Sequence, residues 1–476
     1  MDSSPITPSD KMPRAATFVQ SLIAIVGAAL LVGIGFGIYR IKVELLLIIA
    51  TALTSILAKW LGVPWPEIQA GMNQSILKGM PALVIVIVVG ALVGAWLASG
   101  TIPMITYYGL GLISPKFFLV TAAIAAGIVS LLTGSGYGTI GTIGVAFMGI
   151  ARGFGIAPGP AAGALIAGAY LGDKISPFAG NANFAVGVAR VNIYDHIRHC
   201  LWTTVPAFAV GLAVYAWAGN GVVTGAGPMG QDESVRVALA ANFVFSPWLL
   251  APVALMLGLA ARHQPVLPGM VLSVALSVAL AVFVQHLPFL DALNATVAGP
   301  QNHTGNEVVD KLLAQGGMDR MMHVTLVALC AFAFSGVLQK AGLLEPVVTR
   351  LNAFATTTGR LVGATAASCV VVELMTGAAY VTILLPAELF GPAYRKLGLA
   401  GKNLTRVIGD CGIVGVPLVP WSIASAFMAG TLGVPVSAYA PWAVFCYAGI
   451  LFTLAAGFSG LTMAPRRRED ETLPGS

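Results

Sequence analysis

Two polar, glycine-rich interruptions of apolar sequence constrain this chain more than any other feature. The first opens with TGSGYGTIG at residues 133–141 and closes with LGDKISPFAGNANF at residues 171–184. Apolar runs flank it on both sides. Backbone groups inside hydrocarbon must be hydrogen-bonded by protein, so a broken polar stretch survives there only around a buried site or a wet cavity. This stretch is therefore a candidate binding site.

The same pattern recurs 243 residues later in the chain. The motif TGxxYxTI at residues 133–140 reappears at residues 376–383, and Pro177-Phe178 is matched by Pro420-Trp421 in the same register. Paired hydrophobic segments interrupted by glycine and proline are the best sequence indication of a transporter's substrate site. We therefore predict two structural repeats with broken helices.

Composition places the chain in a membrane. Of its 476 residues, 57% are hydrophobic and only 9% are charged, whereas a soluble domain carries about 25% charged residues. The apolar runs are continuous over about 20 residues rather than alternating over about ten, which favours helices over a transmembrane barrel. We predict an all-α polytopic membrane protein with about 10–12 transmembrane segments.

The cysteines and the net charge limit which ligands and partners the chain is expected to bind. None of the five cysteines forms a CxxC pair, so we expect no disulfide framework, no zinc site and no cofactor. The net charge of +6 comes largely from loop and terminal Lys and Arg, as in membrane proteins with basic cytoplasmic loops, and does not indicate nucleic acid. The first apolar run lacks a small-residue cleavage site, which predicts an uncleaved first span.

The apolar runs and the repeat divide the chain into five parts. We expect N-terminal spans at 1–64, a first transporter repeat at 65–200, connector or scaffold spans at 201–300, a second transporter repeat at 301–438, and a last span with a cytoplasmic tail at 439–476. The basic residues of both termini, including Arg466, Arg467 and Arg468, predict that both lie in the cytoplasm.

Two segments of the first repeat carry polar residues outside the breaks. An amphipathic piece at residues 65–79 is expected to lead into a span at about residues 80–99. The segment RVNIYDHIRH at residues 190–199 is polar on one helical face and is expected at the membrane interface. There we interpret His196 and His199 as contacts to lipid headgroups rather than as metal ligands.

The first interruption contains an acidic residue beside neutral oxygens. Ionisable groups deep in a bilayer cost about 2.5 kcal/mol or more each, so they are functional candidates by default. The carboxylate of Asp173, with the nearby oxygens of Ser176, Asn181 and Asn183, suits a small hard cation. The alternative is that Asp173 and the adjacent Lys174 form an ion pair that holds two broken helices together.

The second half offers two further carboxylates. Glu373 lies near the end of a span, three residues before Thr376, and a lone carboxylate there is a candidate proton carrier, unless it simply reaches the interface. Asp410 lies at the second break, where Arg406 four residues earlier allows a helical salt bridge instead.

Neutral polar side chains gather around both breaks. Half-helix ends aim partial charges at such a site, so we treat the cluster as candidate ligands, although each member alone could be a helix-packing hydrogen bond. Its members are Thr133, Ser135, Thr139, Thr376, Thr382 and Ser422. An intramembrane hydrolase using Ser135 is the enzymatic alternative, but no histidine is placed to activate that serine, so we expect no enzyme.

These residues resemble the NhaC family of sodium/proton antiporters, which lies within the broader ion-transporter superfamily. The resemblance spans about residues 71–435 and is carried by TGSGYGTIGTIGVAFMGIARGFGI, AGALIAGAYLGDKISP, YDHIRH, AFAFSGVLQKAGLLE, LPAELFGPAYRKLGLAGKNLTR and PLVPWSIASAFMAGTLGV. It implies two inverted repeats, re-entrant hairpins, a homodimer and an elevator-like motion.

The chain departs from the family pattern at several polar positions. After GDKISP the family continues with Asp and Thr residues, whereas this chain has FAGNAN at residues 178–183. At the second break the chain reads GDCGIVGVP, without the family's threonines. Glu373 stands where the family has a neutral residue. Several expected cation ligands are therefore absent, and one carboxylate has moved.

We interpret the chain as a secondary transporter of the bacterial inner (plasma) membrane that works by alternating access. Sodium/proton antiport is what the resemblance implies, with the lipid bilayer and a small cation as partners. The substrate site is assigned to Asp173, Ser176, Asn181, Asn183, Thr133, Ser135, Thr376, Asp410 and Ser422, with Glu373 coupling the proton. The alternative is a proton- or sodium-coupled carrier of a small organic acid or amino acid. The carboxylate of such a substrate could bind to the half-helix N-termini and Lys174.

Overall fold

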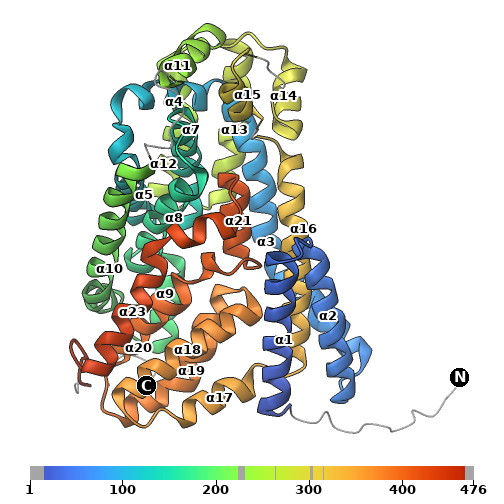
Figure 1. The fold of residues 1–476 in the computed structure, drawn as a ribbon, viewed down its shortest axis with the longest axis vertical. Helices are drawn as coiled ribbons and strands as arrows, with labels where there is room; N and C mark the ends of the chain where they lie inside the picture. Colours follow the sequence, from blue (N-terminus) through green and yellow to red (C-terminus); the bar gives the residue numbers. More distant parts are fainter. Residues whose placement is uncertain (1–15, 223–230, 263, 301–303, 315, 467–476) are drawn as a thin grey trace, which may run out of the picture.

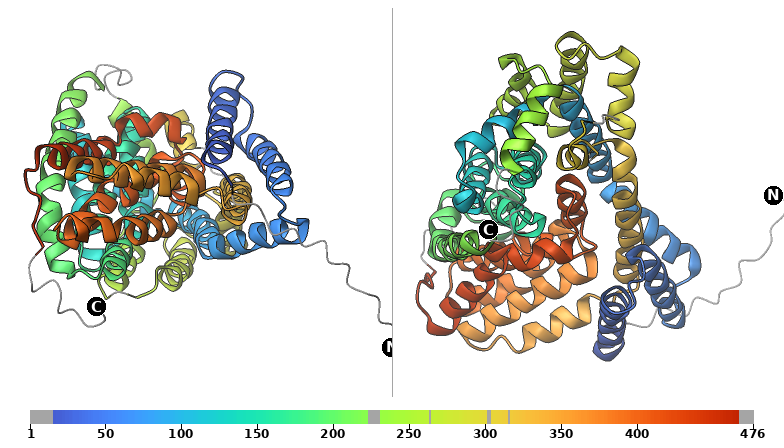
Figure 2. Two further views of the ribbon diagram at one scale, coloured as in Figure 1. Left: turned by 90° about the horizontal axis from the view of Figure 1, so that it is seen from below. Right: turned by 45° about the horizontal axis from the view of Figure 1, so that its top comes forward.

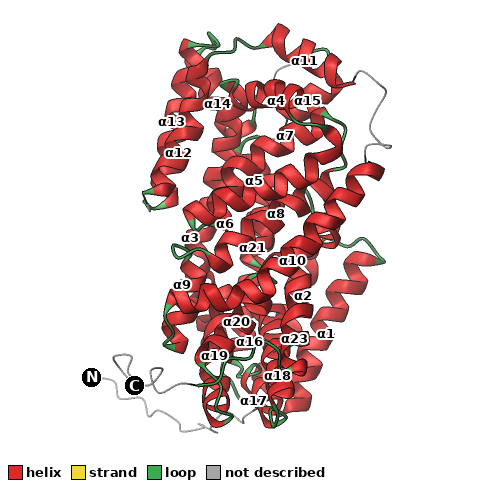
Figure 3. Ribbon diagram, turned by 90° about the vertical axis from the view of Figure 1, so that its left-hand side faces the viewer, coloured by secondary structure: helices red, strands yellow, loops and turns green. Residues whose placement is uncertain are grey.

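The described residues form an all-helical protein, apart from one isolated bridge between Leu399 and Pro465 (Figure 3). The computed structural model describes residues 16–222, 231–262, 264–300, 304–314 and 316–466. The N-terminal residues 1–15 and the tail residues Arg467 and Arg468, which we expect in the cytoplasm, lie outside this part of the chain. The prediction of an all-α protein is confirmed.

Several of these helices can cross a membrane. Within the described ranges, seven helices are long and apolar enough to do so, and three bent helix pairs bring the total to as many as ten if each pair forms one span. The sequence predicts 10–12 crossings, so the helices reach the lower end of that range only when the bent pairs are counted. Membrane spans in this chain are therefore frequently broken.

The first half consists of long outer helices followed by shorter, interrupted ones. The outer helices are α1 (Phe18–Gly37), α2 (Val43–Trp60) and α3 (Trp65–Ala98). The shorter ones are α4 (Thr101–Leu112), α5 (Phe118–Thr133), α6 (Gly136–Thr139), α7 (Val145–Gly153), α8 (Pro158–Ile175) and α9 (Gly180–Ala189), and α10 (Ile193–Val222) ends this half. A π-helical turn at Ile140–Gly144 joins α6 to α7.

The remaining helices belong to the connector and to the second half. The connector holds α11 (Gln231–Asn242), α12 (Ala251–Ala261), α13 (Val266–Phe283), α14 (Phe289–Ala298) and α15 (Glu307–Leu313). The second half holds α16 (Met318–Lys340), α17 (Glu345–Ala353), α18 (Thr358–Thr376), α19 (Ala379–Lys396), α20 (Gly401–Ile408), α21 (Ile423–Leu432), α22 (Val436–Tyr439) and α23 (Val444–Ser459). A π-helical turn at Gly409–Ile413 extends α20.

The repeat-related helices α3 and α16 pack side by side and run in opposite directions. Gly71, near the start of α3, lies against Gly336 and Lys340 near the end of α16. At the other end of the pair, the backbone N–H of Gly317 donates to the carbonyl of Gly90 at 2.9 Å. Glycine allows two helix backbones to approach this closely. The two halves thus have opposite orientations at this pair, as an inverted repeat requires.

Figure 1 shows the same inversion in the helices that follow: α4 lies at the top of the molecule, whereas α17 lies at the bottom. Seen from below in Figure 2, α1 and α2 stand apart from the cluster formed by α18–α20, α23 and the green helices of the first half. The interrupted helices are therefore gathered into one body, with α3 and α16 between it and the N-terminal pair.

Two polar segments of the first repeat belong to longer helices. α3 is one continuous helix with Pro81 inside it, so the amphipathic residues 65–79 and the span that follows them form one element. Its first part remains helical because Gly71 and Gly79 pack directly against α16. Likewise the polar segment at residues 190–199 largely belongs to α10, which begins at Ile193 and continues as a membrane span.

Each half contains a hairpin whose tip is a left-handed glycine. Gly134 (φ +68) ends α5, and Gly377 (φ +58) ends α18. A Cβ on Gly134 would lie 2.4 Å from the carbonyl carbon of Phe178, and one on Gly377 would lie 3.0 Å from the carbonyl oxygen of Trp421. Phe178 and Trp421 are themselves repeat-related positions. The tip of each hairpin therefore packs against the second chain break of its own half.

Close packing of α5 on α8 generates a first prediction. A Cβ on Gly172 would lie 2.1 Å from the backbone carbonyl carbon of Ser130, so Gly172→Ala must push the two helices apart. We expect this change to destabilise the protein by about 1–3 kcal/mol, which is typical of overpacking. It is measured as a lower melting temperature of the purified protein in detergent.

The matched control is Gly187→Ala in α9, where a Cβ would meet no atom within 4 Å. That change replaces a helical glycine by the better helix former and should leave the melting temperature equal or slightly higher. Equal melting of the two variants would contradict the account of α5–α8 packing.

Candidate functional site

A cavity of about 390 Å³ lies where the first hairpin tip meets the end of α8. Its polar wall is formed by the sequence-predicted residues Thr133, Ser135, Asp173 and Asn181. The opposite wall comes from the α12–α13 hairpin, including Met256, Leu259, Gln264 and Gly269. These connector spans carry few charges, which predicts a connector or scaffold. Their contribution to the cavity is visible only in the folded chain.

Asp173 is the acidic residue of this cavity. It lies in the last turn of α8, and its side chain is almost completely buried within the protein. The side-chain amide of Asn181, in the first turn of α9, donates to Asp173 Oδ2 at 2.9 Å. The break between α8 and α9 lets the chain turn back so that these two side chains meet. A buried carboxylate with one amide partner retains free lone pairs for a further ligand.

Hydroxyl oxygens at the hairpin tip complete the polar wall. The hydroxyl of Thr133 donates to the carbonyl of Val129 at 2.9 Å, and the hydroxyl oxygen of Ser135 accepts from the N–H of Gly138 at 3.0 Å as an N-cap. Each oxygen has a further lone pair. One carboxylate with hydroxyl and amide oxygens is a set that a small hard cation prefers.

Ser176 and Asn183 hold the first chain break together. The hydroxyl of Ser176 donates to the carbonyl of Leu131 at 2.7 Å, which joins the end of α8 to α5. The side-chain amide of Asn183 donates to the carbonyls of Pro177 and Ala179, both at 2.8 Å. These contacts satisfy backbone acceptors that the interrupted helix leaves unpaired. Both residues lie beside the cavity wall rather than in it.

Thr376 and Ser422 lie at the chain breaks of the second half, where Thr376 is the counterpart of Thr133. The hydroxyl of Thr376 donates to the carbonyl of Val372 at 2.8 Å. Ser422 is the N-cap of α21: it donates to the carbonyl of Val416 at 2.7 Å and accepts from the N–H of Ser425 at 3.0 Å. These two residues are at the second hairpin tip and its facing break, outside the Asp173 cavity.

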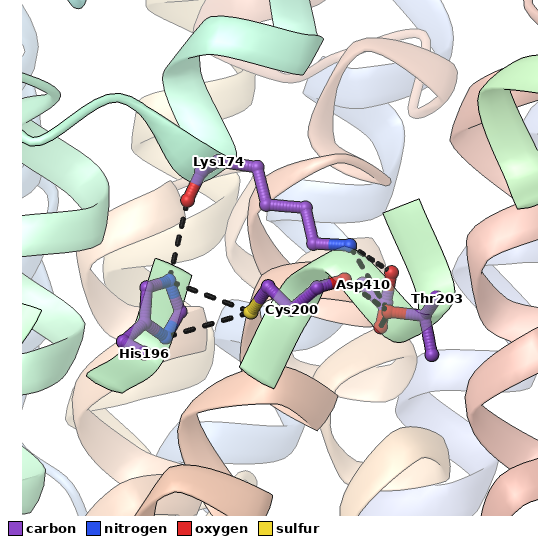
Figure 4. Close-up of polar contacts among 5 residues, drawn as sticks. All are labelled: Lys174, His196, Cys200, Thr203 and Asp410. Carbon is purple, nitrogen blue, oxygen red and sulfur yellow. Dashed lines mark hydrogen bonds and ion pairs between the residues drawn. The ribbon is translucent and has the colours of Figure 1, made fainter. Parts of the chain in front are cut away.

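The carboxylate of Asp410 forms a buried ion pair with Lys174, which joins the two halves (Figure 4). Both side chains are at most 1% exposed. The hydroxyl of Thr203, on α10, donates to Asp410 Oδ2 at 2.8 Å. The pair brings α8, the π-helical turn at Gly409–Ile413 and α10 together. The two buried charges are stabilised here by each other and by the Thr203 hydroxyl.

This ion pair corrects two alternatives considered for the sequence. Adjacent residues on a helix point to different sides, so Lys174 turns away from Asp173 and reaches Asp410 in the other half. Arg406 instead donates to the backbone carbonyl and the hydroxyl of Thr462, at 3.2 and 2.9 Å. The alternative Asp173–Lys174 and Arg406–Asp410 pairs are therefore not formed among the described residues.

His196 does not face lipid headgroups, contrary to expectation. It is fully buried, and its Nδ1 lies 3.0 Å from the hydroxyl oxygen of Thr405. Its Nε2 lies 3.2 Å from the backbone carbonyl of Lys174 (Figure 4). His196, Cys200 and Thr203 have the spacing of one helical face, which is the signal that could have indicated a buried polar stripe. This stripe supports the ion pair from α10.

Glu373 is a buried carboxylate of the second half. Its side chain is 3% exposed, and Oε1 has no hydrogen-bond partner among the described residues. A Cβ on Gly415 would lie 2.9 Å from Glu373 Oε2. The repeat-related pair in the first half is Ser130 against Gly172. Glu373 thus places a carboxylate where the other half has a small hydroxyl.

Comparison with known proteins agrees with this architecture. The model of the Na+/H+ antiporter family matches residues 10–182 and 168–461. An uncharacterized Na+/H+ antiporter of Haemophilus influenzae is 37% identical over 96% of this chain and 98% of its own. The Na+/H+ antiporters NhaC of Alkalihalophilus pseudofirmus and Bacillus subtilis are 36% and 34% identical, over 89% and 87% of this chain and 92% and 91% of theirs.

The buried ion pair generates a second prediction. Lys174→Met leaves Asp410 as an uncompensated buried charge, which typically costs about 3–5 kcal/mol of stability. We expect a markedly lower melting temperature in detergent. Adding Asp410→Leu removes the remaining charge, so the double variant should recover most of the loss. A single variant that melts like the unsubstituted protein would show that the pair does not hold the two halves together.

Proposed function

The chain belongs to the Na+/H+ antiporter family, and from this membership we propose that it exchanges sodium ions for protons across the membrane. This chain covers 98% and 92% of the length of two relatives with this name. It is a secondary carrier that changes the side to which its site opens, and not an enzyme.

The observation that carries the proposal is the buried carboxylate of Asp173 in a polar cavity at two broken helices. A sodium ion bound there receives one negative charge and neutral oxygens from Thr133 and Ser135. The amide of Asn181, which donates to Asp173, would present its oxygen to the cation after a rotation of its side chain. In the other state of the cycle a proton neutralises Asp173, and the cavity holds no net charge.

Competition between the two ions at one carboxylate is sufficient for antiport. An unpaired charge is costly inside a membrane, so the empty and ionised site is the state least able to cross. Only the sodium-bound and the protonated forms change sides readily, and this couples the two fluxes. The Lys174–Asp410 pair, being internally neutral, can remain intact throughout.

We further propose the orientation and location of the chain. The ends of α10 and α20 that carry Arg198 and Lys402 are near Arg466, the last described residue, whose backbone N–H donates to the carbonyl of Gly398 at 2.8 Å. Clustering of basic residues at this end assigns it to the cytoplasm. The chain would then lie in the bacterial plasma membrane with its C-terminus inside.

A third prediction tests antiport directly. Proteoliposomes with an acid interior and an internal pH dye should lose their pH gradient when sodium is added outside, but not when potassium is added. Asp173→Asn removes the charged ligand while retaining its size, and should raise the sodium concentration for half-maximal exchange by about 100-fold, or roughly 2.7 kcal/mol.

Asp319→Asn at the start of α16, where the side chain is exposed, is the matched control and should exchange normally. Failure of sodium to collapse the gradient in the unsubstituted protein would refute antiport. A panel of small carboxylates and amino acids would then test the organic-substrate alternative. Normal sodium dependence in Asp173→Asn would move the site away from this cavity.

A fourth prediction concerns Glu373, which we propose as an additional proton-carrying group. Its carboxyl group is buried, and Oε1 has no hydrogen-bond partner among the described residues, so replacing it by an amide that cannot titrate should alter how exchange responds to pH. We expect Glu373→Gln to lower the exchange rate at least tenfold near neutral pH and to flatten its pH profile. The control Glu388→Gln changes an exposed carboxylate in α19. An unchanged pH profile in Glu373→Gln would falsify this role.

A further inference from the structure

A second polar cavity, of about 440 Å³, lies at the end of the molecule where α10 and α20 begin. We propose that it binds a phosphate-bearing anion, supplied by the headgroup of an anionic phospholipid. Its walls are Arg198, His199, Trp202 and Lys402, together with Asp195 and residues 462–464. None of these residues belongs to the cavity around Asp173. The proposal therefore stands independently of the ion that the protein transports.

One helical face supplies half of this cavity. Asp195, Arg198, His199 and Trp202 are spaced as i, i+3, i+4 and i+7 along α10, so their side chains lie on one side of its first two turns. Asp195, Arg198 and His199 belong to the YDHIRH motif, and Trp202 follows it. The buried ion-pair network uses His196 from the same motif but not these four residues. The transport site therefore does not explain them.

The opposite wall is held rigidly by hydrogen bonds. The N–H of Ala400 donates to the carbonyl of Ala464 at 3.0 Å, and the amide side chain of Asn403 both donates to that carbonyl at 2.7 Å and accepts from the N–H of Ala464 at 2.9 Å. Arg406, which is fully buried, donates to both oxygens of Thr462. The chain after α23 thus forms a fixed edge beside Lys402.

The charges of this cavity favour an anion. No ion pair formed among the described residues involves Arg198 or Lys402, and Asp195 contributes a single carboxylate to the same cavity. Arg and Lys together are the usual donors to phosphate, Arg through its fork of N–H groups. Two cations against one carboxylate leave a positive excess, which Arg406 behind the wall increases.

One buried nitrogen atom of the cavity wall also lacks a hydrogen-bond partner in the described part of the chain. It is Nε2 of His199, whose side chain is 7% exposed and lines the cavity. In the tautomer that carries the proton on Nε2, it is a buried donor without an acceptor, which is uncommon in folded proteins. An anion against this wall would provide the acceptor oxygens that the protein itself does not.

The position of the cavity selects a lipid over a soluble phosphate. α10 is a membrane span, and the cavity is formed by its first turns, where the span meets the interface. Trp202, which is 65% exposed, lies one turn deeper along the same face. Tryptophan is enriched at headgroup level, and basic pockets between spans on the cytoplasmic side suit anionic headgroups. A phospholipid can contact the basic residues and the indole together.

The test is lipid retention by the purified full-length protein, measured by native mass spectrometry during titration with phosphatidylglycerol or phosphatidylcholine. The unsubstituted protein should retain phosphatidylglycerol selectively. The double variant Arg198→Gln/Lys402→Gln should bind it about tenfold more weakly. The charge-conserving pair Arg198→Lys/Lys402→Arg should retain selectivity, which excludes misfolding as the cause of the loss.

The control Arg395→Gln/Lys396→Gln removes the same two charges from exposed positions of α19, outside the cavity, and should retain the lipid normally. Equal retention by this control and by Arg198→Gln/Lys402→Gln would overturn the site. Inorganic phosphate forms a separate arm: phosphate binding without selectivity for phosphatidylglycerol would overturn the lipid as its source.

Discussion

Ending helices inside a membrane without leaving their backbone groups unpaired is the constraint on which the rest of this structure depends. Each half meets it in the same way. A hairpin tip turns at a left-handed glycine, Gly134 or Gly377, and packs against a second break in the same half. Side-chain caps such as Ser135 and Ser422 then satisfy the free N–H groups. In the first half, the polar cavity around Asp173 lies where the hairpin tip at Gly134 meets the break after α8.

The two halves share this scaffold but not their charges. Asp173 corresponds to Val416 in the repeat, Asp410 to Ala167, and Glu373 to Ser130. Each carboxylate therefore occurs once, and the Lys174–Asp410 pair crosses from one half to the other. An inverted repeat whose two halves share a backbone plan but differ in charge can hold a single ion site. The related halves still allow the protein to open to either side of the membrane. We propose that this difference in charge allows one site to serve both ions in antiport.

The helical class, the repeat and four polar residues of the Asp173 cavity (Thr133, Ser135, Asp173 and Asn181) were accessible from sequence, because glycine, proline and polar residues are conspicuous in apolar surroundings. Partners across the fold were not. Lys174 pairs with Asp410, 236 positions away, rather than with its neighbour, and His196 is buried against Thr405. The apolar residues of α12 and α13 that close the cavity carry no local signal of this role. Such contacts depend on how helices pack, which periodicity does not specify.

The central claim is that one carboxylate, Asp173, binds either sodium or a proton. Calorimetric titration of the purified protein with sodium, in two buffers of different ionisation enthalpy, measures the protons released for each ion bound. The account predicts proton release with sodium binding at neutral pH, and loss of both in Asp173→Asn. Sodium binding without proton release, or release that persists in Asp173→Asn, would contradict it.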